Sequence, residues 1–177
     1  FIQARPYLFY ENDTEFGFKK IDETECDSIS IDLDTVHIED YEKQKMIYNT
    51  DSFKIYEVVE KKSKKIFLAK TFENLDDISL EINTQLILKN NKSSFLKFIG
   101  CSPFNFKKEP KPVIIYENAS NGSLQNLLEI SNKNDKIQGW TDTKKLIFLY
   151  GLASGMSYLN SLNYIHYNLK PENILLD

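Results

Sequence analysis

Residues 164–177 read YIHYNLKPENILLD, and this stretch decides what the rest of the chain can be. Its first part places a histidine, two asparagines, a lysine and a glutamate around Pro171. An apolar run, Ile174–Leu176, follows and predicts a short strand. Side chains of these types can hold protons, phosphate groups or metal ions. The stretch is therefore an active centre, the remnant of one or a chance string, and the remaining residues must decide.

The composition is that of a globular protein. The chain has 177 residues, of which 41% are hydrophobic and 27% charged, enough for one large domain or two small lobes. No apolar run reaches the roughly 20 residues of a membrane helix, and no secretion signal is recognisable, so no membrane association is expected. The first residue is Phe1 rather than methionine, which indicates a fragment or a processed start.

Cysteine and charge usage narrow the setting. Cys26 and Cys101 lie 75 residues apart, a spacing that matches no metal site, and two cysteines are too few for a disulfide scaffold. Reduced thiols in an intracellular, cytoplasmic protein are expected. The only arginine is Arg5, and the lysine clusters have the composition of loop tips. Nucleic-acid binding is therefore not expected.

The net charge of −4 hides a boundary in composition. Residues 1–43 hold 12 acidic and 4 basic side chains, whereas residues 44–177 hold 14 acidic and 18 basic ones. Residues 1–40 are therefore interpreted as an acidic leader. A weak alternation of apolar residues near Ile31 predicts either a short strand or a disordered acidic segment there.

Residues 41–117 are interpreted as a first lobe. Five alternating or apolar runs predict strands, at residues 41–48, 53–60, 66–72, 95–102 and 113–117. After the third run, an apolar stripe recurs at helical spacing: Ile78, Ile82, Leu86 and Leu88. These patterns predict an α+β lobe, a curled, meandering antiparallel sheet of five strands with one helix packed on it.

Residues 118–122 are interpreted as a hinge, and residues 123–177 begin a helical lobe. Ser123 is a plausible N-cap of a short helix. A long helix follows behind Thr141–Thr143, and its predicted buried stripe is Leu146, Leu149, Ala153, Met156 and Leu159. Gly151 and Gly155 inside this helix indicate close packing rather than a binding role.

Together these features resemble a eukaryotic protein kinase domain, over roughly Asp40–Asp177. The usual catalytic loop reads His-Arg-Asp-Leu-Lys-Pro-Glu-Asn, and His166–Asn173 matches it in six of eight positions. The stretches FIGCSP and KPVIIYENASNGSLQNLL resemble the tyrosine-kinase-like (TKL) group of serine/threonine kinases. The resemblance implies a bilobal kinase fold, with a five-stranded N-lobe and the start of a helical C-lobe.

The resemblance also implies a site for ATP. Lys70, at the end of the third strand, would hold the ATP phosphates and would itself be held by Glu81. A lysine among apolar neighbours needs such a partner, although Glu81 can also be read as an exposed helix residue. In the linker, Glu117 and Ala119 would offer main-chain groups to adenine, behind a large gatekeeper, Tyr116.

The glycine-rich loop of the family is lost. Its three glycines let bare backbone N–H groups approach phosphates, and the same positions here are Tyr48, Thr50 and Phe53. Side chains at these positions obstruct that approach. Binding of ATP and Mg²⁺ is therefore expected to be weakened, and the alternative is an ordinary hairpin that binds nothing.

The catalytic loop is altered as well. Asn168 stands where the family has its catalytic aspartate, and an amide can accept a hydrogen bond but cannot hold a proton near neutral pH. Tyr167 replaces an arginine that pairs with phosphate on the activation loop. By the resemblance, Lys170 would neutralise the γ-phosphate and Asn173 would hold a metal ion. His166 is expected to be a packing and hydrogen-bonding residue.

Two functions remain open. The first is a degenerate kinase domain, a pseudokinase that holds a nucleotide or scaffolds protein partners in signalling. The alternative is part of a weakly active serine/threonine kinase that transfers the γ-phosphate of ATP to proteins. Because the chain stops at Asp177, before the family's Asp-Phe-Gly segment, it is expected to be a piece of a larger domain and inactive alone. A third option, a leader that docks on a basic partner, cannot be weighed from the sequence.

Overall fold

The computed structural model describes residues 4–6, 19–20, 34–73, 78, 81–82, 85, 88, 94–132, 139–166 and 168–176. The chain forms two compact units, each described here by itself. The first, called the sheet unit, comprises Asp27–Asn90 and Lys97–Asn118. The second, called the helical unit, comprises Phe1–Cys26, Asn91–Leu96 and Ala119–Asp177. The predicted alternation near Ile31 lies outside the described residues.

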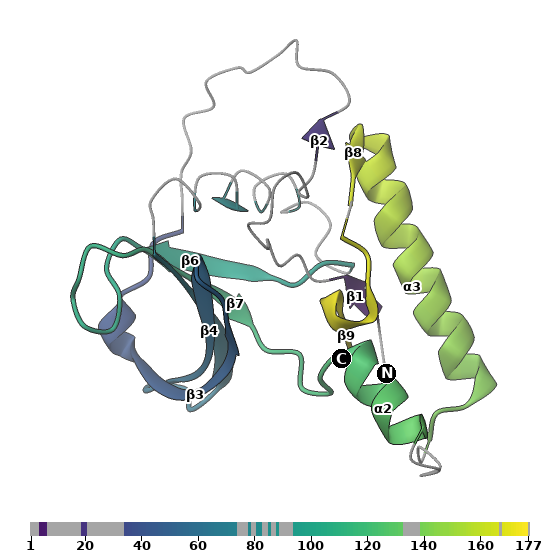
Figure 1. Ribbon diagram of the computed structural model, residues 1–177, viewed down its shortest axis with the longest axis horizontal. Coiled ribbons are helices and arrows are strands. Elements are labelled where there is room, and N and C mark those ends of the chain that lie inside the picture. Colours follow the sequence, from purple (N-terminus) through teal and green to yellow (C-terminus); the bar gives the residue numbers. More distant parts are fainter. Residues whose placement is uncertain are drawn as a thin grey trace. The chain divides into compact units, whose positions relative to one another are not determined.

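The sheet unit contains the five predicted strands. They are β3 (Tyr41–Asn49), β4 (Phe53–Glu60), β5 (Ile66–Phe72), β6 (Phe98–Ser102) and β7 (Val113–Glu117). All pairings are antiparallel, in the order β3-β4-β5-β7-β6 (Figure 1). The α+β prediction is confirmed. The order differs from a simple meander, because β6 lies at the edge and β7 returns between β5 and β6.

Between β5 and β6 the chain is helical at the described positions Ile78, Glu81, Ile82, Gln85 and Leu88. The buried positions are Ile78, Glu81, Gln85 and Leu88. Of the other predicted stripe members, Ile82 is only half-buried and Leu86 lies outside the described residues. The buried stripe thus keeps its helical spacing but includes a glutamate and a glutamine. A glutamate can take such a position only if it finds a buried partner.

The core of the sheet unit lies between the sheet and the segment before it. Buried Val58, Ala69, Val113 and Ile115 pack with Tyr41 and with Ile38 from a short 3-10 helix, η1 (Ile38–Asp40). The described residues just before Tyr41 are therefore part of this unit.

Residues 34–36 pair with the edge of β6 that does not face β7. Thr35 pairs with Cys101 in a parallel bridge, and the amide of Val36 donates to the Cys101 carbonyl at 2.9 Å. A Cβ atom at Gly100 would lie 2.6 Å from both the Asp34 carbonyl oxygen and a Val36 methyl group. Glycine at this position is what lets the segment approach so closely.

The described part of the helical unit includes the α-helices α2 (Leu124–Asn132) and α3 (Asp142–Ser161). The oxygens of Ser123 and Thr141 accept bonds from the amides of Asn126 and Lys144, so both predicted caps are present. Two short pairs complete the unit: β1 (Ala4–Pro6) with β9 (Ile174–Leu176), and β2 (Lys19–Lys20) with β8 (Tyr164–Ile165).

The buried face of α3 differs from the predicted stripe. The residues that are buried are Phe148, Gly151, Gly155 and Leu159. Leu146 and Leu149 are exposed, at 67% and 56%. The error arises because apolar residues occur almost all round this helix, so its sequence fits more than one stripe. Both glycines lie on the buried face, in agreement with a packing role.

Candidate functional site

The sheet unit places a lysine and a glutamate in a buried ion pair. Lys70 lies in β5, opposite Ile55 of β4 and Ile114 of β7. Its Nζ donates to Oε2 of Glu81 at 2.8 Å, and the two side chains are 0% and 3% exposed. The contact expected between these residues is therefore present, while their role toward a nucleotide stays a prediction.

Three aromatic side chains complete this cluster, here called the Lys70 cluster. The hydroxyl of Tyr116 donates to Oε1 of Glu81 at 2.5 Å, so both carboxylate oxygens accept a bond. The Lys70 ammonium lies 4.3 Å from the ring centre of Phe53 and 5.0 Å from that of Phe72. Ring faces attract a cation, most strongly where water is excluded. Within the sheet unit, the Lys70 ammonium thus contacts one carboxylate and two ring faces.

The hairpin between β3 and β4 includes Thr50–Phe53, where the resemblance implied the glycine-rich loop. Its backbone is closed by a bond from the Thr50 amide to the Phe53 carbonyl at 3.0 Å. The Phe53 amide donates to Oγ1 of Thr50 at 3.1 Å, and that hydroxyl donates back to the Phe53 carbonyl at 2.9 Å. The N–H groups of both residues are already used. Tyr48 stacks on Phe53, with ring centres 5.8 Å apart.

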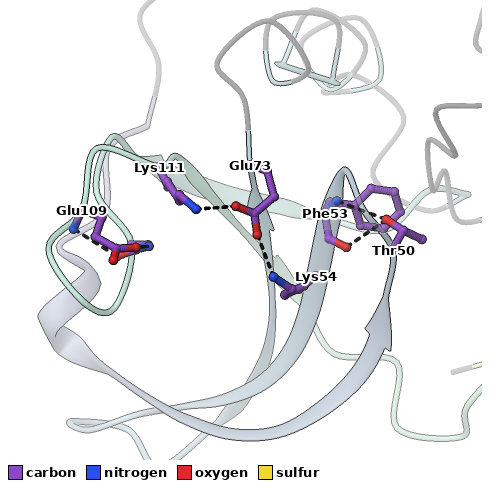
Figure 2. A network of polar contacts seen from close by, with 7 residues as sticks. Thr50, Phe53, Lys54, Glu73, Glu109 and Lys111 are labelled. Atoms are coloured by element: carbon purple, nitrogen blue, oxygen red, sulfur yellow. Dashed lines mark hydrogen bonds and ion pairs between the residues drawn. The ribbon is translucent and has the colours of Figure 1, made fainter.

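Glu73 ties the base of this hairpin to the sheet (Figure 2). Its carboxylate accepts from Lys54 at 2.7 Å and from Lys111, which lies on the segment before β7. Its amide donates to the Ser52 carbonyl at 3.0 Å. The bonds from Lys111 and Lys54 hold the pKa of Glu73 down at about 2. Sequence reasoning passed over Glu73, because its partners lie 19 and 38 residues away in the chain.

Glu73→Gln is expected to lower the free energy of unfolding by about 1 kcal/mol at neutral pH, because the pairs are partly exposed. The carboxyl pKa is lower in the folded than in the unfolded protein, so this stability is complete above pH 4.5 and is lost as pH falls toward about 2. Melting temperatures measured from pH 7 to pH 2 should therefore converge for the two proteins at the acid end. Exposed Glu42→Gln on β3 is the control. A constant gap down to pH 2 would contradict the assignment.

The helical unit holds the loop that was expected to be catalytic. Asn168 is half-buried, and its amide donates to the carbonyl of His166 at 2.5 Å and to Nδ1 of the same residue at 3.3 Å. The buried Asn173 donates through Nδ2 to the Asn168 carbonyl at 2.9 Å. Its own amide donates to the Lys170 carbonyl across the 3-10 helix η2 (Pro171–Asn173). The loop is thus closed on itself, and Tyr167 lies outside the described residues.

His166 is a neutral side chain in this loop. Burial lowers its pKa to about 4, so the imidazole carries no charge at physiological pH. Its Nδ1 accepts the Asn168 amide, which fits the expected packing and hydrogen-bonding role. At position 168 itself the loop presents an amide, which cannot take up a proton.

The linker residues are held by local bonds. Glu117 ends β7, its amide donates to the Lys97 carbonyl at 3.0 Å, and its carboxylate accepts from the Lys97 amide at 2.9 Å. The carbonyl of Ala119 accepts from the Gly122 amide at 3.4 Å, in a turn where Gly122 has a φ of +74°. The main-chain contacts to adenine expected of Glu117 and Ala119 stay predictions.

The residues present do not fit a triphosphate as they stand. A phosphate that binds Lys70 must touch its ammonium, yet Lys70 is fully buried against Glu81 and two rings. Backbone N–H groups that would cradle phosphates are already bonded at Thr50 and Phe53. Among the described residues, no group of three His, Cys, Asp or Glu side chains is arranged to hold a metal ion. The metal role expected of Asn173 stays a prediction.

Besides Glu73, sequence reasoning missed two features of the Lys70 cluster. The bond from Tyr116 to Glu81 joins residues 35 apart in the chain, and no local pattern reports it. Phe53 was recognised as a glycine replacement, but the sequence does not tell that its ring turns inward onto Lys70. The only signal for this arrangement is a lysine placed among apolar neighbours.

Comparisons of the sequence with known proteins identify the family of the chain. A family model described as protein tyrosine and serine/threonine kinase matches residues 48–177. The chain is 38% identical over 65 residues to a probable LRR receptor-like serine/threonine-protein kinase, IRK, of Arabidopsis thaliana, which covers 37% of this chain and 6% of that protein. It is also 38% identical over 72 residues to the inhibitor of nuclear factor kappa-B kinase subunit alpha of Gallus gallus, covering 41% and 9%. The chain thus spans less than a tenth of each of these relatives.

In the part of the chain that the structure describes, no helix combines the length and the apolar character needed to cross a bilayer.

Proposed function

The chain belongs to the protein tyrosine and serine/threonine kinase family, and we propose that it is a kinase domain impaired in phosphate transfer, a TKL-group pseudokinase that scaffolds protein partners in cytoplasmic signalling. The relatives named as a serine/threonine-protein kinase and as a kinase subunit support the kinase part of this proposal, and the choice of group rests on the stretches FIGCSP and KPVIIYENASNGSLQNLL. In this proposal the domain binds nucleotide weakly, and a bound nucleotide stabilises the fold and does not donate its phosphate.

One observation carries this proposal: an amide at position 168. Transfer to a hydroxyl is helped by a group that accepts the hydroxyl proton, and such general-base catalysis typically contributes about 10²–10⁴ in rate. Asn168 holds its place in the loop through its backbone, by bonds with His166 and Asn173. The loop is therefore held in shape by bonds that need no proton acceptor at position 168. A scaffold needs only that shape, whereas an efficient enzyme also needs the acceptor.

The Lys70 cluster supports the same proposal. Glu81 links Lys70 in the sheet to the helix, and Tyr116 adds a second bond from β7 to the same carboxylate. These bonds brace the sheet unit from within, without any ligand. A domain that works through its surface needs this rigidity.

The alternative is a weakly active serine/threonine kinase. It is supported by the Lys70–Glu81 contact and by the presence of Lys170 and Asn173 at positions where the family has functional residues. In this alternative, Asn168 still orients the substrate hydroxyl by accepting its hydrogen bond, at a rate far below that of an aspartate enzyme.

Replacement of Asn168 in cells separates the two functions. In cells that depend on the protein, full-length Asn168→Ala is expected to restore growth or signalling as well as wild type, because a scaffold does not use the amide. Asn160→Ala, at an exposed position of α3, is the control. Loss of function in Asn168→Ala at normal protein level, with Asn160→Ala unaffected, would favour the enzyme.

A further inference from the structure

The Lys70 ammonium is enclosed on every side that the described contacts define. Glu81 lies 2.8 Å from it, the Phe53 ring centre 4.3 Å and the Phe72 ring centre 5.0 Å, and the side chain is 0% exposed. Any ligand that touches the ammonium must first displace one of these groups. Phe72 is fixed within β5, where its amide donates to the Pro112 carbonyl. Phe53 begins β4 at a position where the resemblance implies a glycine, so its ring is the group that this chain adds beside Lys70.

We propose that the ring of Phe53 is a plug, which occupies the place beside Lys70 that a nucleotide phosphate would need. This inference rests on the proposed function, since the family assigns Lys70 to the phosphates. The face of the Phe53 ring stands where a phosphate anion would stand. It attracts the positive charge of the Lys70 ammonium although the ring itself is uncharged. The site is thereby closed to polyphosphates by this chain's own side chain.

The plug is held in place from three directions. Tyr48 stacks on the Phe53 ring at an interplanar angle of 27°. The Thr50 hydroxyl binds both the amide and the carbonyl of Phe53. The amide of Glu73 binds the Ser52 carbonyl, and its carboxylate binds Lys54, the residue after Phe53. The hairpin is thus a clamped element, where a phosphate-binding loop must be open to its ligand.

The Phe53 ring blocks the place of the phosphate groups and leaves the place of the base open. It should therefore weaken the binding of ATP and leave the binding of adenosine unchanged. A polyphosphate needs the Lys70 ammonium, which is enclosed, and open hairpin N–H groups, of which those of Thr50 and Phe53 are already bonded. An uncharged nucleoside needs neither. The triphosphate should therefore add nothing to the affinity of adenosine in the wild-type protein, and removal of the ring should restore its contribution.

The test is isothermal titration calorimetry of the full-length protein with ATP plus Mg²⁺ and, separately, with adenosine. In Phe53→Gly the affinity for ATP is expected to rise about 10- to 100-fold, the range of a regained charge-assisted bond, while the affinity for adenosine stays as in wild type. Val58→Ala, a buried truncation on the same strand that contacts a different cluster, is the control for lost stability and should leave ATP binding unchanged.

Two results would overturn the plug. One is a folded Phe53→Gly that binds ATP no better than wild type. The other needs no variant: wild-type protein that binds ATP more than about tenfold tighter than adenosine. ATP binding that is absent or no tighter than that of adenosine supports the plug. Equilibrium binding reports on the plug alone, whereas the pseudokinase proposal fails only if phosphate transfer or dependence on Asn168 is found.

Discussion

Glu81→Leu is expected to lower the free energy of unfolding by about 3–5 kcal/mol, the usual effect of removing one member of a buried ion pair. The substitution takes away the carboxylate that lies 2.8 Å from the buried Lys70 ammonium. It also takes away the acceptor of the Tyr116 hydroxyl. Both groups were removed from water at a cost that this carboxylate offsets. Guanidinium denaturation of the full-length protein measures the change.

The double variant Lys70→Met/Glu81→Leu is the matched control for this prediction. It removes both charges and keeps similar apolar volume, so it should recover much of the lost stability, because replacement of a whole buried pair is often neutral or stabilising. Tyr116→Phe should cost about 1.5–3 kcal/mol, the range of a single hydrogen bond to a charged group. If the free energy of unfolding of Glu81→Leu lay within about 0.5 kcal/mol of wild type, the Lys70–Glu81 ion pair would contribute no more than an exposed surface pair, and the prediction would be wrong.

Asn168→Asp is expected to raise phosphate transfer by about 10²–10⁴-fold when it is made in full-length protein that also carries Phe53→Gly. The second substitution is needed because the plug would otherwise keep ATP from the site. A carboxylate at position 168 supplies the proton acceptor that the amide lacks, in a loop already closed by His166 and Asn173. Initial rates at saturating ATP, with a protein substrate, give the ratio.

Asn160→Asp in the same Phe53→Gly background is the control for added negative charge, since Asn160 is exposed on α3. It should leave the rate unchanged. A gain of less than tenfold for Asn168→Asp, with ATP shown to be bound, would mean that the missing carboxylate does not limit transfer.

The fold was predictable because strand patterns and helical spacing are local properties. The runs that end at Phe72 and Glu117 were read correctly as strands, since each alternates or is apolar between turn-forming residues. The strand order was not predictable, because the pairing of β5 with β7 depends on a crossover of 40 residues between Phe72 and Val113. The prediction of the buried face of α3 was wrong for a different reason, because the apolar residues of this helix do not define a single stripe.

The site was predictable where one rule of chemistry applied. A lysine among apolar residues requires a partner, and Glu81 was the glutamate in the helical stripe. The direction of the Phe53 ring and the bond from Tyr116 to Glu81 depend on packing between elements distant in sequence, which one sequence does not encode in readable form. Glu73 belongs to the same class, with partners from β4 and from the segment before β7.

In the proposed function, the amide at position 168 and the Phe53 ring beside Lys70 act in the same direction, since both disfavour phosphate transfer. A site that cannot use a triphosphate gains nothing from keeping Asp at position 168. A buried ammonium that needs no ligand still stabilises the sheet unit through Glu81.

The most direct measurement is transfer of labelled γ-phosphate by the full-length wild-type protein, at millimolar ATP and Mg²⁺, beside its Lys70→Met variant. The account predicts that wild type incorporates no more label into a protein substrate than Lys70→Met does. Clear incorporation by wild type that disappears in a folded Lys70→Met protein would contradict it, because Lys70 would then be reaching phosphate despite Phe53.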